Sequence, residues 1–258
     1  MAPVTVHCVR HAQGFHNISV ANHAMHDPML TPLGEEQCKA LQTKFSFMDR
    51  VDAVVASPMK RTVYTALHSF APAIKDKRLK VIALPELQET SDLPCDTGSS
   101  VQDLESEFKG QPVDWSYLYT PSAKAWNSKL GKWSATASAV DDRARIAREW
   151  LHNRPEKEIV VVTHGGFLHY LIEDWMDTNK NGTGTGWANT EYRSYTFGSN
   201  PKSGRPVFVE TPQSRARRMG DEKPLSRSEQ TNLQRVESRQ KAEEEKAYQK
   251  ASGIQAKV

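Results

Sequence analysis

The chain is short of cysteine, of long apolar runs and of net charge. Its three cysteines lie far apart and form no CxxC pair, so we expect reduced, packed thiols and neither a disulfide framework nor a zinc knuckle. No run approaches the ~20 apolar residues that span a bilayer. The first residues also lack the charged and apolar regions of a signal peptide. We therefore expect a cytoplasmic or nuclear protein that is not secreted and has no membrane span.

The two signs of charge are nearly balanced. The 34 Lys and Arg residues and 31 Asp and Glu residues give a net charge of +3, which is too small for a dedicated nucleic-acid binder. Residues 1–210 carry 23 basic and 24 acidic side chains, whereas residues 211–258 carry 11 and 7. The second segment is polar and cannot bury enough surface to fold alone, so we expect a flexible tail or a solvated helix. The positive excess therefore belongs to the tail.

Short β-branched runs alternate with helical patterns before the tail. We expect strands at residues 4–9, 51–56, 81–84 and 159–163, and helices at residues 33–47, 58–70, 140–152 and 167–176. Thr31 and Ser57, each followed by proline, are the predicted N-caps of the first two helices. Two later runs, at 190–197 and 205–210, predict an antiparallel edge. The pattern predicts an α/β fold, in which helices cover both faces of a mostly parallel sheet in a three-layer α/β/α sandwich.

Residues 90–135 interrupt this alternation. They carry Trp115, Trp126 and other aromatic residues among proline, serine and aspartate. An insertion of this length in an α/β domain is typical of a lid or a substrate-shaping subdomain. The alternative is that the aromatic side chains build a small core of the insertion itself, and the sequence leaves both interpretations open.

Arginine and histidine side chains follow three of the predicted parallel strands. Arg10 and His11 end the first strand, Arg61 lies on the first turn after the second, and His164 and Gly165 follow the strand at 159–163. Ligands of open α/β sheets bind at the carboxyl ends of the strands. Guanidinium groups and backbone N–H groups bind phosphate oxygens, and a neutral imidazole can attack phosphorus without a metal. The sequence therefore predicts a phosphate site, with the developing charge met by the arginines and a protonated second histidine.

Five motifs together resemble the phosphoglycerate-mutase-like branch of the histidine phosphatase superfamily, in its order and spacing. They are Arg10-His11-Ala12 with Asn17, Leu30 to Gln37, Ser57-Pro58 with Arg61, Thr65 and Ala66, Leu87-Gln88-Glu89, and Val162 to Gly166. The resemblance implies a phosphoglycerate-mutase-like fold with a catalytic domain over residues 1–210 and no cofactor. It leaves the tail at 211–258 unmatched.

The resemblance also implies a role for each matching residue. His11 is the expected nucleophile that becomes phosphohistidine. Glu89 is the expected donor of a proton to the leaving group and the later base, with Glu86 as its rival. The residues expected to bind the phosphoryl group are Arg10, Asn17, Arg61, His164 and Gly165. The candidates for shaping the substrate site are Gln13, Gly14, Phe15, Trp115 and Trp126.

Two departures from the family pattern bear on function. Ala12 replaces the usual glycine, which the loop can absorb unless it needs positive φ. Residues 90–98 replace the family's common sequence after the acid and lack the paired arginines of true mutases. The chain is therefore most similar to fungal phosphomutase-like phosphatases. This similarity implies a metal-independent phosphatase that hydrolyses a phosphate monoester, or a related organic phosphate or diphosphate, as its small-molecule partner. The alternative is a phosphoglycerate-type phosphomutase.

Two other interpretations remain. Histidines crowd the N-terminal region, but no HExxH or His-x-Glu spacing accompanies them, so we predict no metal site. A different class of function is an inactive phosphatase scaffold that recruits partners through its basic tail. The lysines of the insertion, Lys109, Lys124, Lys129 and Lys132, suggest a bulky or polyanionic substrate. The sequence predicts neither the physiological substrate nor the oligomeric state.

Overall fold

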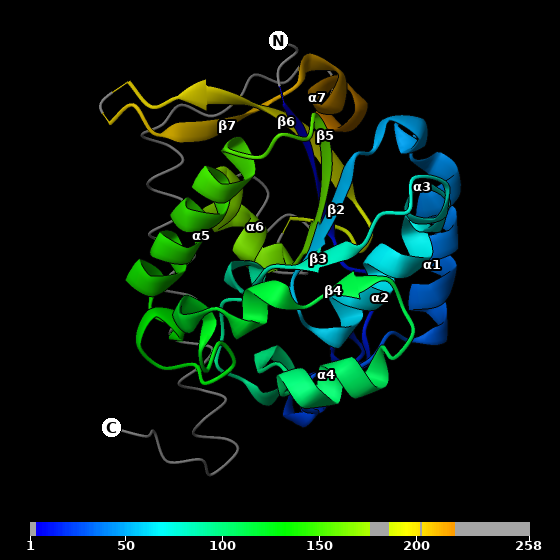
Figure 1. Ribbon diagram of the computed structural model, residues 1–258, viewed down its shortest axis with the longest axis vertical. Helices are drawn as coiled ribbons and strands as arrows, with labels where there is room; N and C mark the ends of the chain where they lie inside the picture. The colour runs from blue at the N-terminus through cyan, green and yellow to red at the C-terminus, as the bar shows by residue number, and fades with distance from the viewer. Residues whose placement is uncertain (1–3, 176–185, 202, 220–258) are drawn as a thin grey trace.

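A seven-stranded sheet runs through the centre of the protein in the order β4-β3-β2-β5-β1-β6-β7 (Figure 1). The computed structural model describes residues 4–175, 186–201 and 203–219. The strands are β1 Thr5–Arg10, β2 Ala53–Ala56, β3 Val81–Ala83, β4 Val113–Asp114, β5 Glu158–Thr163, β6 Tyr192–Ser199 and β7 Pro206–Glu210. The first five pair in parallel, whereas β6 and β7 are antiparallel, which confirms the mostly parallel sheet with an antiparallel edge.

Helices cover both faces of this sheet. Figure 1 shows α1, α2 and α3 on one face and α5 and α6 on the other. The helices are α1 Pro32–Lys44, α2 Lys60–Ser69, α3 Ala71–Asp76, α4 Val101–Glu107, α5 Ala137–His152, α6 Gly165–Ile172 and α7 Pro212–Met219. The predicted three-layer α/β/α sandwich is therefore confirmed. The sequence pattern did not predict the short elements α3, α4 and β4.

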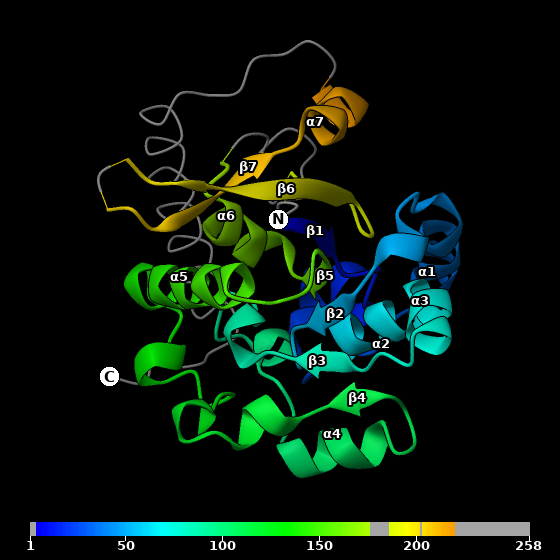
Figure 2. The same cartoon turned by 45° about the horizontal axis from the view of Figure 1, so that its top comes forward.

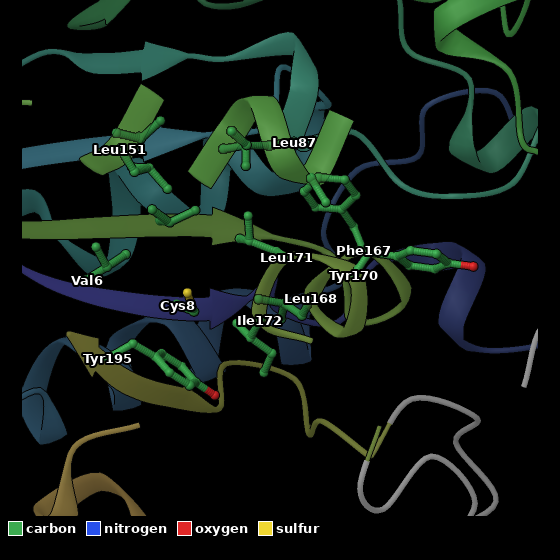
Figure 3. Close-up of a cluster of buried hydrophobic side chains, with 14 of the residues drawn as sticks. Val6, Cys8, Leu87, Leu151, Phe167, Leu168, Tyr170, Leu171, Ile172 and Tyr195 are labelled. Atoms are coloured by element: carbon green, nitrogen blue, oxygen red, sulfur yellow. The ribbon is translucent and has the colours of Figure 1, made fainter. Parts of the chain in front are cut away.

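Strand β5 shows why an unbroken apolar run belongs in the centre of such a sheet. Its residues from Ile159 to Val162 are fully buried, because β5 lies between β1 and β2 and has helices on both sides. Alternate side chains enter different cores: Val161 packs with residues of α5 and α6, and Val160 packs with residues of α1 and α2. Figure 3 shows the first core, where Val6 and Cys8 of β1 lie near apolar residues of α6. The cysteines are free and buried, as expected.

The aromatic residues of the insertion at residues 90–135 form a core together with Met59 and Val63 at the start of α2. Its strand β4 extends the sheet beside β3, at the edge opposite β7 (Figure 2). Trp126 is only 2% exposed and packs with Leu104, Phe108 and Trp133, and Trp115 packs against the same cluster. This burial corrects the prediction that Trp115 and Trp126 shape the substrate site, because their rings build the core of the insertion. A role of the insertion as a lid or substrate-shaping subdomain stays a prediction.

The first part of the predicted tail is a packed helix. In α7, Ser214 is buried, and its Oγ accepts a hydrogen bond from the Ser194 N–H and donates one to Glu210. Arg218 forms ion pairs with Glu210 at 2.7 Å and Asp174 at 3.3 Å. The boundary predicted at residue 210 is therefore too early, because polar contacts that an apolar count overlooks hold this helix to β6 and β7. Residues 220–258 lie outside the described residues.

The helices that the structure describes are too short or too polar to cross a membrane.

Candidate active site

The site lies at the carboxyl ends of β1, β5 and β2, which are neighbours in the sheet. His11 directly follows β1, His164 follows β5, and Arg61 is the second residue of α2 after β2. The rings of His11 and His164 have centroids 5.2 Å apart, and Arg61 Nε lies 3.3 Å from His11 Nε2. The structure thus brings together the strand-end residues that the parallel topology predicted.

A backbone carbonyl fixes the tautomer of His11. The His11 Nδ1 atom lies 2.7 Å from the Ala12 carbonyl oxygen, which can only accept, so Nδ1 carries the proton. The Nε2 atom then keeps its lone pair, in agreement with its role as acceptor from the Arg61 Nε–H. The nitrogen that carries the lone pair therefore faces the arginine that would hold a phosphoryl group.

Burial and nearby cations keep His11 and His164 neutral. Burial lowers the pKa of His11 well below its usual value, and the charges of Arg61 and Arg10 lower it further. The pKa of His164 is lowered in the same way, first by burial and then by Arg61. A neutral His11 can act as a nucleophile at pH 7. The predicted protonation of His164 would require the charge of a bound phosphoryl group.

Three buried nitrogens around His11 have no hydrogen-bond partner among the described residues. They are Arg10 Nε, His16 Nδ1 and His164 Nδ1. The His16 ring lies 5.4 Å from that of His11, and burial lowers its pKa to about 3. A buried polar atom without a partner is costly, so a ligand with several acceptor oxygens would suit this pocket. His16, one of the histidines that crowd the N-terminal region of the sequence, thus lies beside the expected nucleophile, a place that the sequence motifs did not indicate.

The Glu89 side chain caps the start of helix α6. Its Oε1 accepts hydrogen bonds from the N–H groups of Phe167 and Thr90, both at 2.9 Å, and its Oε2 accepts one from Gly166 at 3.2 Å. The Glu89 charge also acts on Arg10. Two N–H groups at this helix terminus therefore bind a carboxylate of the protein itself. Oε2, with one N–H partner, keeps lone pairs for proton transfer.

The rival Glu86 is directed elsewhere. Its Oε1 lies 3.5 Å from Lys132 Nζ in the insertion. Arg143, a buried residue of α5 that the sequence analysis missed, donates hydrogen bonds to the carbonyls of Glu86, Gln88 and Glu89. Arg143 fixes the backbone of this turn, so that Glu89 reaches α6 while Glu86 does not. The geometry favours Glu89 as the acid.

Ser57 does not cap α2. The helix begins at Lys60 with Met59 as its N-cap and no side-chain cap, so this prediction was wrong. The Ser57 Oγ instead lies 2.9 Å from His164 Nε2. This contact fixes the orientation of His164. The sequence did not indicate this role, because Ser-Pro is also a helix-start signal. By contrast, Thr31 is confirmed as the cap of α1, since its Oγ1 accepts from the Gly34 N–H.

The start of α1 holds the loop that carries His11. Gln13 donates its N–H to the Gln37 side chain and accepts from the Thr31 N–H and hydroxyl. A side chain at Gly34 would approach the Gln13 carbonyl to 2.2 Å, so glycine allows this close contact. Ala12 is not among the described residues with positive φ, so its methyl group fits the loop without strain.

The remaining predicted residues of this loop lie at its outer end. Asn17 is exposed, and its Oδ1 accepts a hydrogen bond from the Gly14 N–H. Phe15 is half-buried and is held by backbone contact with Met29. Their contacts with a phosphoryl group or substrate stay predictions, as does that of the buried Gly165 at the start of α6.

Two further charged residues reach the site from the insertion. Asp96 pairs with Arg61 at 2.8 Å. Lys129 donates a hydrogen bond to the Glu89 carbonyl at 3.3 Å, and its charge acts on His164. The sequence indicated Lys129 only as one of four lysines that suggest a polyanionic substrate, and it assigned no role to Asp96. Over residues 4–175, 186–201 and 203–219, no cluster of three His, Cys, Asp or Glu residues is arranged to hold a metal ion.

Comparisons of the sequence with known proteins identify the family of this chain. The sequence pattern of the histidine phosphatase superfamily (branch 1) matches residues 6–203. The chain belongs to this superfamily. A Schizosaccharomyces pombe protein named "Probable phosphatase" is 31% identical over 163 residues, covering 62% of this chain and 74% of the relative. An Arabidopsis thaliana phosphoglycerate mutase-like protein is 31% identical over 231 residues, covering 74% and 83%.

A solved structure shares the histidine phosphatase fold. The ecdysone phosphate phosphatase of Bombyx mori, in complex with tungstate, has a TM-score of 0.54 at 16% identity and covers 81% of this chain and 93% of its own. Family membership supports an enzyme of the histidine phosphatase type with a phosphatase or mutase-like role. The superfamily pattern ends at residue 203, so α7 lies beyond it.

Proposed function

We propose that this histidine phosphatase hydrolyses phosphate monoesters without a metal, through a phosphohistidine on His11. The observation that supports this most is the combination at His11: a neutral imidazole, a lone pair on Nε2, and a guanidinium at 3.3 Å from that atom. A metal is not needed to activate such a nucleophile, because the imidazole is already uncharged at neutral pH.

In the first step, His11 Nε2 forms a bond to phosphorus as the ester P–O bond breaks. The guanidiniums of Arg10 and Arg61 and the Nδ1 of His164 balance charge on the phosphoryl oxygens. The leaving oxygen takes a proton from the carboxyl group of Glu89, and the alcohol departs. Glu89 is then a carboxylate, the form that the N–H groups of α6 stabilise.

In the second step, water attacks the phosphohistidine. Glu89 takes a proton from the water as its oxygen bonds to phosphorus, and the P–N bond to His11 breaks. Inorganic phosphate leaves, His11 regains its lone pair, and Glu89 is protonated for the next cycle. The same two residues therefore serve both halves of the reaction.

A phosphomutase is the second candidate, because the Arabidopsis relatives are named phosphoglycerate mutase-like proteins. A mutase would pass the phosphoryl group to a second hydroxyl group of its substrate instead of to water. The absence of the paired arginines after Glu89 in the sequence favours water as the acceptor. Incubation with 3-phosphoglycerate separates the two: we expect release of inorganic phosphate and no accumulation of 2-phosphoglycerate.

Hydrolysis of a chromogenic aryl phosphate tests the proposal. We expect turnover in the wild type that vanadate blocks and EDTA leaves unchanged, and loss of at least ~10³-fold in His11→Ala. His26→Ala is the matched control, because His26 is exposed in the same region. Loss of activity with EDTA would contradict the metal-free mechanism, and a fully active His11→Ala would contradict the nucleophile. A wild type without turnover on any ester would favour the inactive scaffold.

A further inference from the structure

The segment that departs most from the family pattern supplies a buried anion beside the phosphate pocket. Asp96 ends the short 3-10 helix η5 (Pro94–Asp96) and is 8% exposed. Its Oδ1 accepts a hydrogen bond from Arg61 at 2.8 Å, and its Oδ2 accepts one from the Ser91 hydroxyl at 2.6 Å. Both carboxylate oxygens are therefore held, one by the arginine and one by its own loop.

These contacts fix the guanidinium of Arg61, which is fully buried. Its second terminal nitrogen donates to the Cys95 carbonyl at 2.6 Å, and its Nε donates to His11 Nε2. Cys95 and Asp96 thus set the plane of the Arg61 guanidinium and direct its Nε–H at His11. Guanidinium has five N–H groups, so two remain for the oxygens of a ligand.

The groups around Asp96 keep it charged. Burial raises its pKa, but Arg61, Lys129, His16 and the Ser91 hydrogen bond lower it, and the net pKa is below the usual value. Asp96 is therefore a carboxylate at neutral pH. Its oxygens and those of a phosphoryl group are acceptors for the same guanidinium, and the two like charges repel each other.

We infer that Asp96 is a positioning residue for Arg61 that also limits how tightly the pocket retains inorganic phosphate. This inference rests on the proposed phosphatase function. A fixed guanidinium lowers the reorganisation needed in phosphoryl transfer, while the adjacent negative charge weakens binding of the product dianion. A phosphatase has to release phosphate in every turnover, whereas a mutase has to keep its phosphoryl group. Asp96 therefore favours hydrolysis.

The variant Asp96→Asn tests both parts of the inference. Asparagine has the same shape, its oxygen can still accept from Arg61, and its amide can donate to the Ser91 hydroxyl, so only the charge is removed. We expect kcat to fall about tenfold, because a neutral acceptor holds the guanidinium less firmly. We expect competitive inhibition by inorganic phosphate to become about tenfold tighter, because the like charge is gone.

Two matched variants separate charge from positioning. Ser91→Ala keeps the Asp96 charge but releases Oδ2, so kcat should fall about threefold with unchanged phosphate inhibition. Asp92→Asn removes a charge from an exposed side chain in the same loop and should change neither constant. Thermal unfolding of each variant shows whether it is folded.

Opposite changes in kcat and phosphate affinity distinguish this role from a purely structural one. If Asp96→Asn weakens both phosphate binding and kcat, the loop has only collapsed and the inference is wrong. It is equally wrong if the variant matches the wild type. If the wild type hydrolyses no ester, the proposed function fails, while calorimetric titration with inorganic phosphate still tests the effect of Asp96 on binding.

Discussion

At the scale of single residues, hydrogen bonds to the backbone decide the chemistry. The Ala12 carbonyl selects the tautomer of His11, and the N–H groups of α6 hold the carboxylate of Glu89. The first contact is local, whereas the second joins Glu89 to N–H groups that lie 77 and 78 residues further along the chain. The arrangement distinguishes Glu89 from Glu86, whose side chain pairs with Lys132 instead.

Substitutions of the two glutamates should affect kcat to very different extents. Glu89→Gln removes the proton donor and should lower kcat for an alkyl phosphate by about 10²–10⁴-fold, with a smaller loss for a nitrophenyl phosphate, whose leaving group needs no proton. Glu86→Gln is the matched control and should stay within about threefold of the wild type. Steady-state kinetics with both esters checks this. Equal losses in both variants would show that the assignment of the acid is incorrect.

At the scale of elements, the insertion contributes charge to the site while its aromatic residues build its own core. Of its four lysines, Lys129 donates to the Glu89 carbonyl, and Lys132 pairs with Glu86. Lys129 has a positive φ of 56°, a backbone conformation unusual for a lysine. Burial lowers its pKa to about 8. The prediction of a polyanionic substrate therefore concerns Lys129 first, because its amino group lies at the Glu89 carbonyl.

Lys129→Met should discriminate between esters by the charge of their leaving groups. We expect KM to rise about tenfold for an ester with a second anionic group, because one cation near the leaving group is lost, and to change less than threefold for an uncharged aryl phosphate. Lys124→Met, at an exposed position of the same segment, is the control. An equal rise in KM for both esters would mean that Lys129 contributes to folding or phosphate binding only.

Helix α7 gives a second prediction for an element. Arg218→Met removes the ion pairs with Glu210 and Asp174, so the free energy of unfolding should fall by about 1–3 kcal/mol. Arg217→Met should cost less, because Arg217 is exposed and lies over the Tyr192 ring. Denaturant unfolding checks both. A larger effect of Arg217→Met would argue against docking through Arg218.

At the scale of the whole molecule, the fold concentrates neutral histidines in one buried pocket. Burial lowers the pKa values of His11, His16 and His164 below the usual 6.5, whereas in the unfolded chain these residues titrate normally. Below pH ~6.5 the unfolded chain therefore binds more protons than the folded one. The free energy of unfolding is therefore highest above this pH. It falls as the pH decreases toward the pKa values of these histidines in the folded state.

Each of these histidines should reduce the free energy of unfolding by up to about 1.4 kcal/mol per pH unit below ~6.5. Urea unfolding near pH 7.5 and near pH 5.5 measures the total. His16→Asn should make this dependence shallower, whereas His26→Asn, at an exposed position, should not. A free energy of unfolding that is constant over this range, or that rises at low pH, would contradict the claim that these histidines are neutral in the folded protein.

The sequence predicted the sheet and most of the site because both follow from local patterns and topology. Arg10 ends a strand, and His11, Arg61 and His164 lie after strands. Parallel strands bring their carboxyl ends together. Asp96 and His16 could not be predicted in this way, since the Arg61–Asp96 contact depends on the path of an irregular loop. Ser57 was misassigned because Ser-Pro is also a helix-start signal. Helix α7 was missed because polar contacts hold it.

The position of phosphate on His11 tests the central claim most directly. Rapid mixing with an aryl phosphate and quenching in alkali, where phosphohistidine survives, yields protein for mass spectrometry and phosphorus NMR. Because the Ala12 carbonyl holds the proton on Nδ1, we predict an adduct on His11 at Nε2, absent in His11→Ala and accumulating in Glu89→Gln with an aryl substrate. A phosphorylated Nδ1, or turnover with no adduct on His11, would contradict the account.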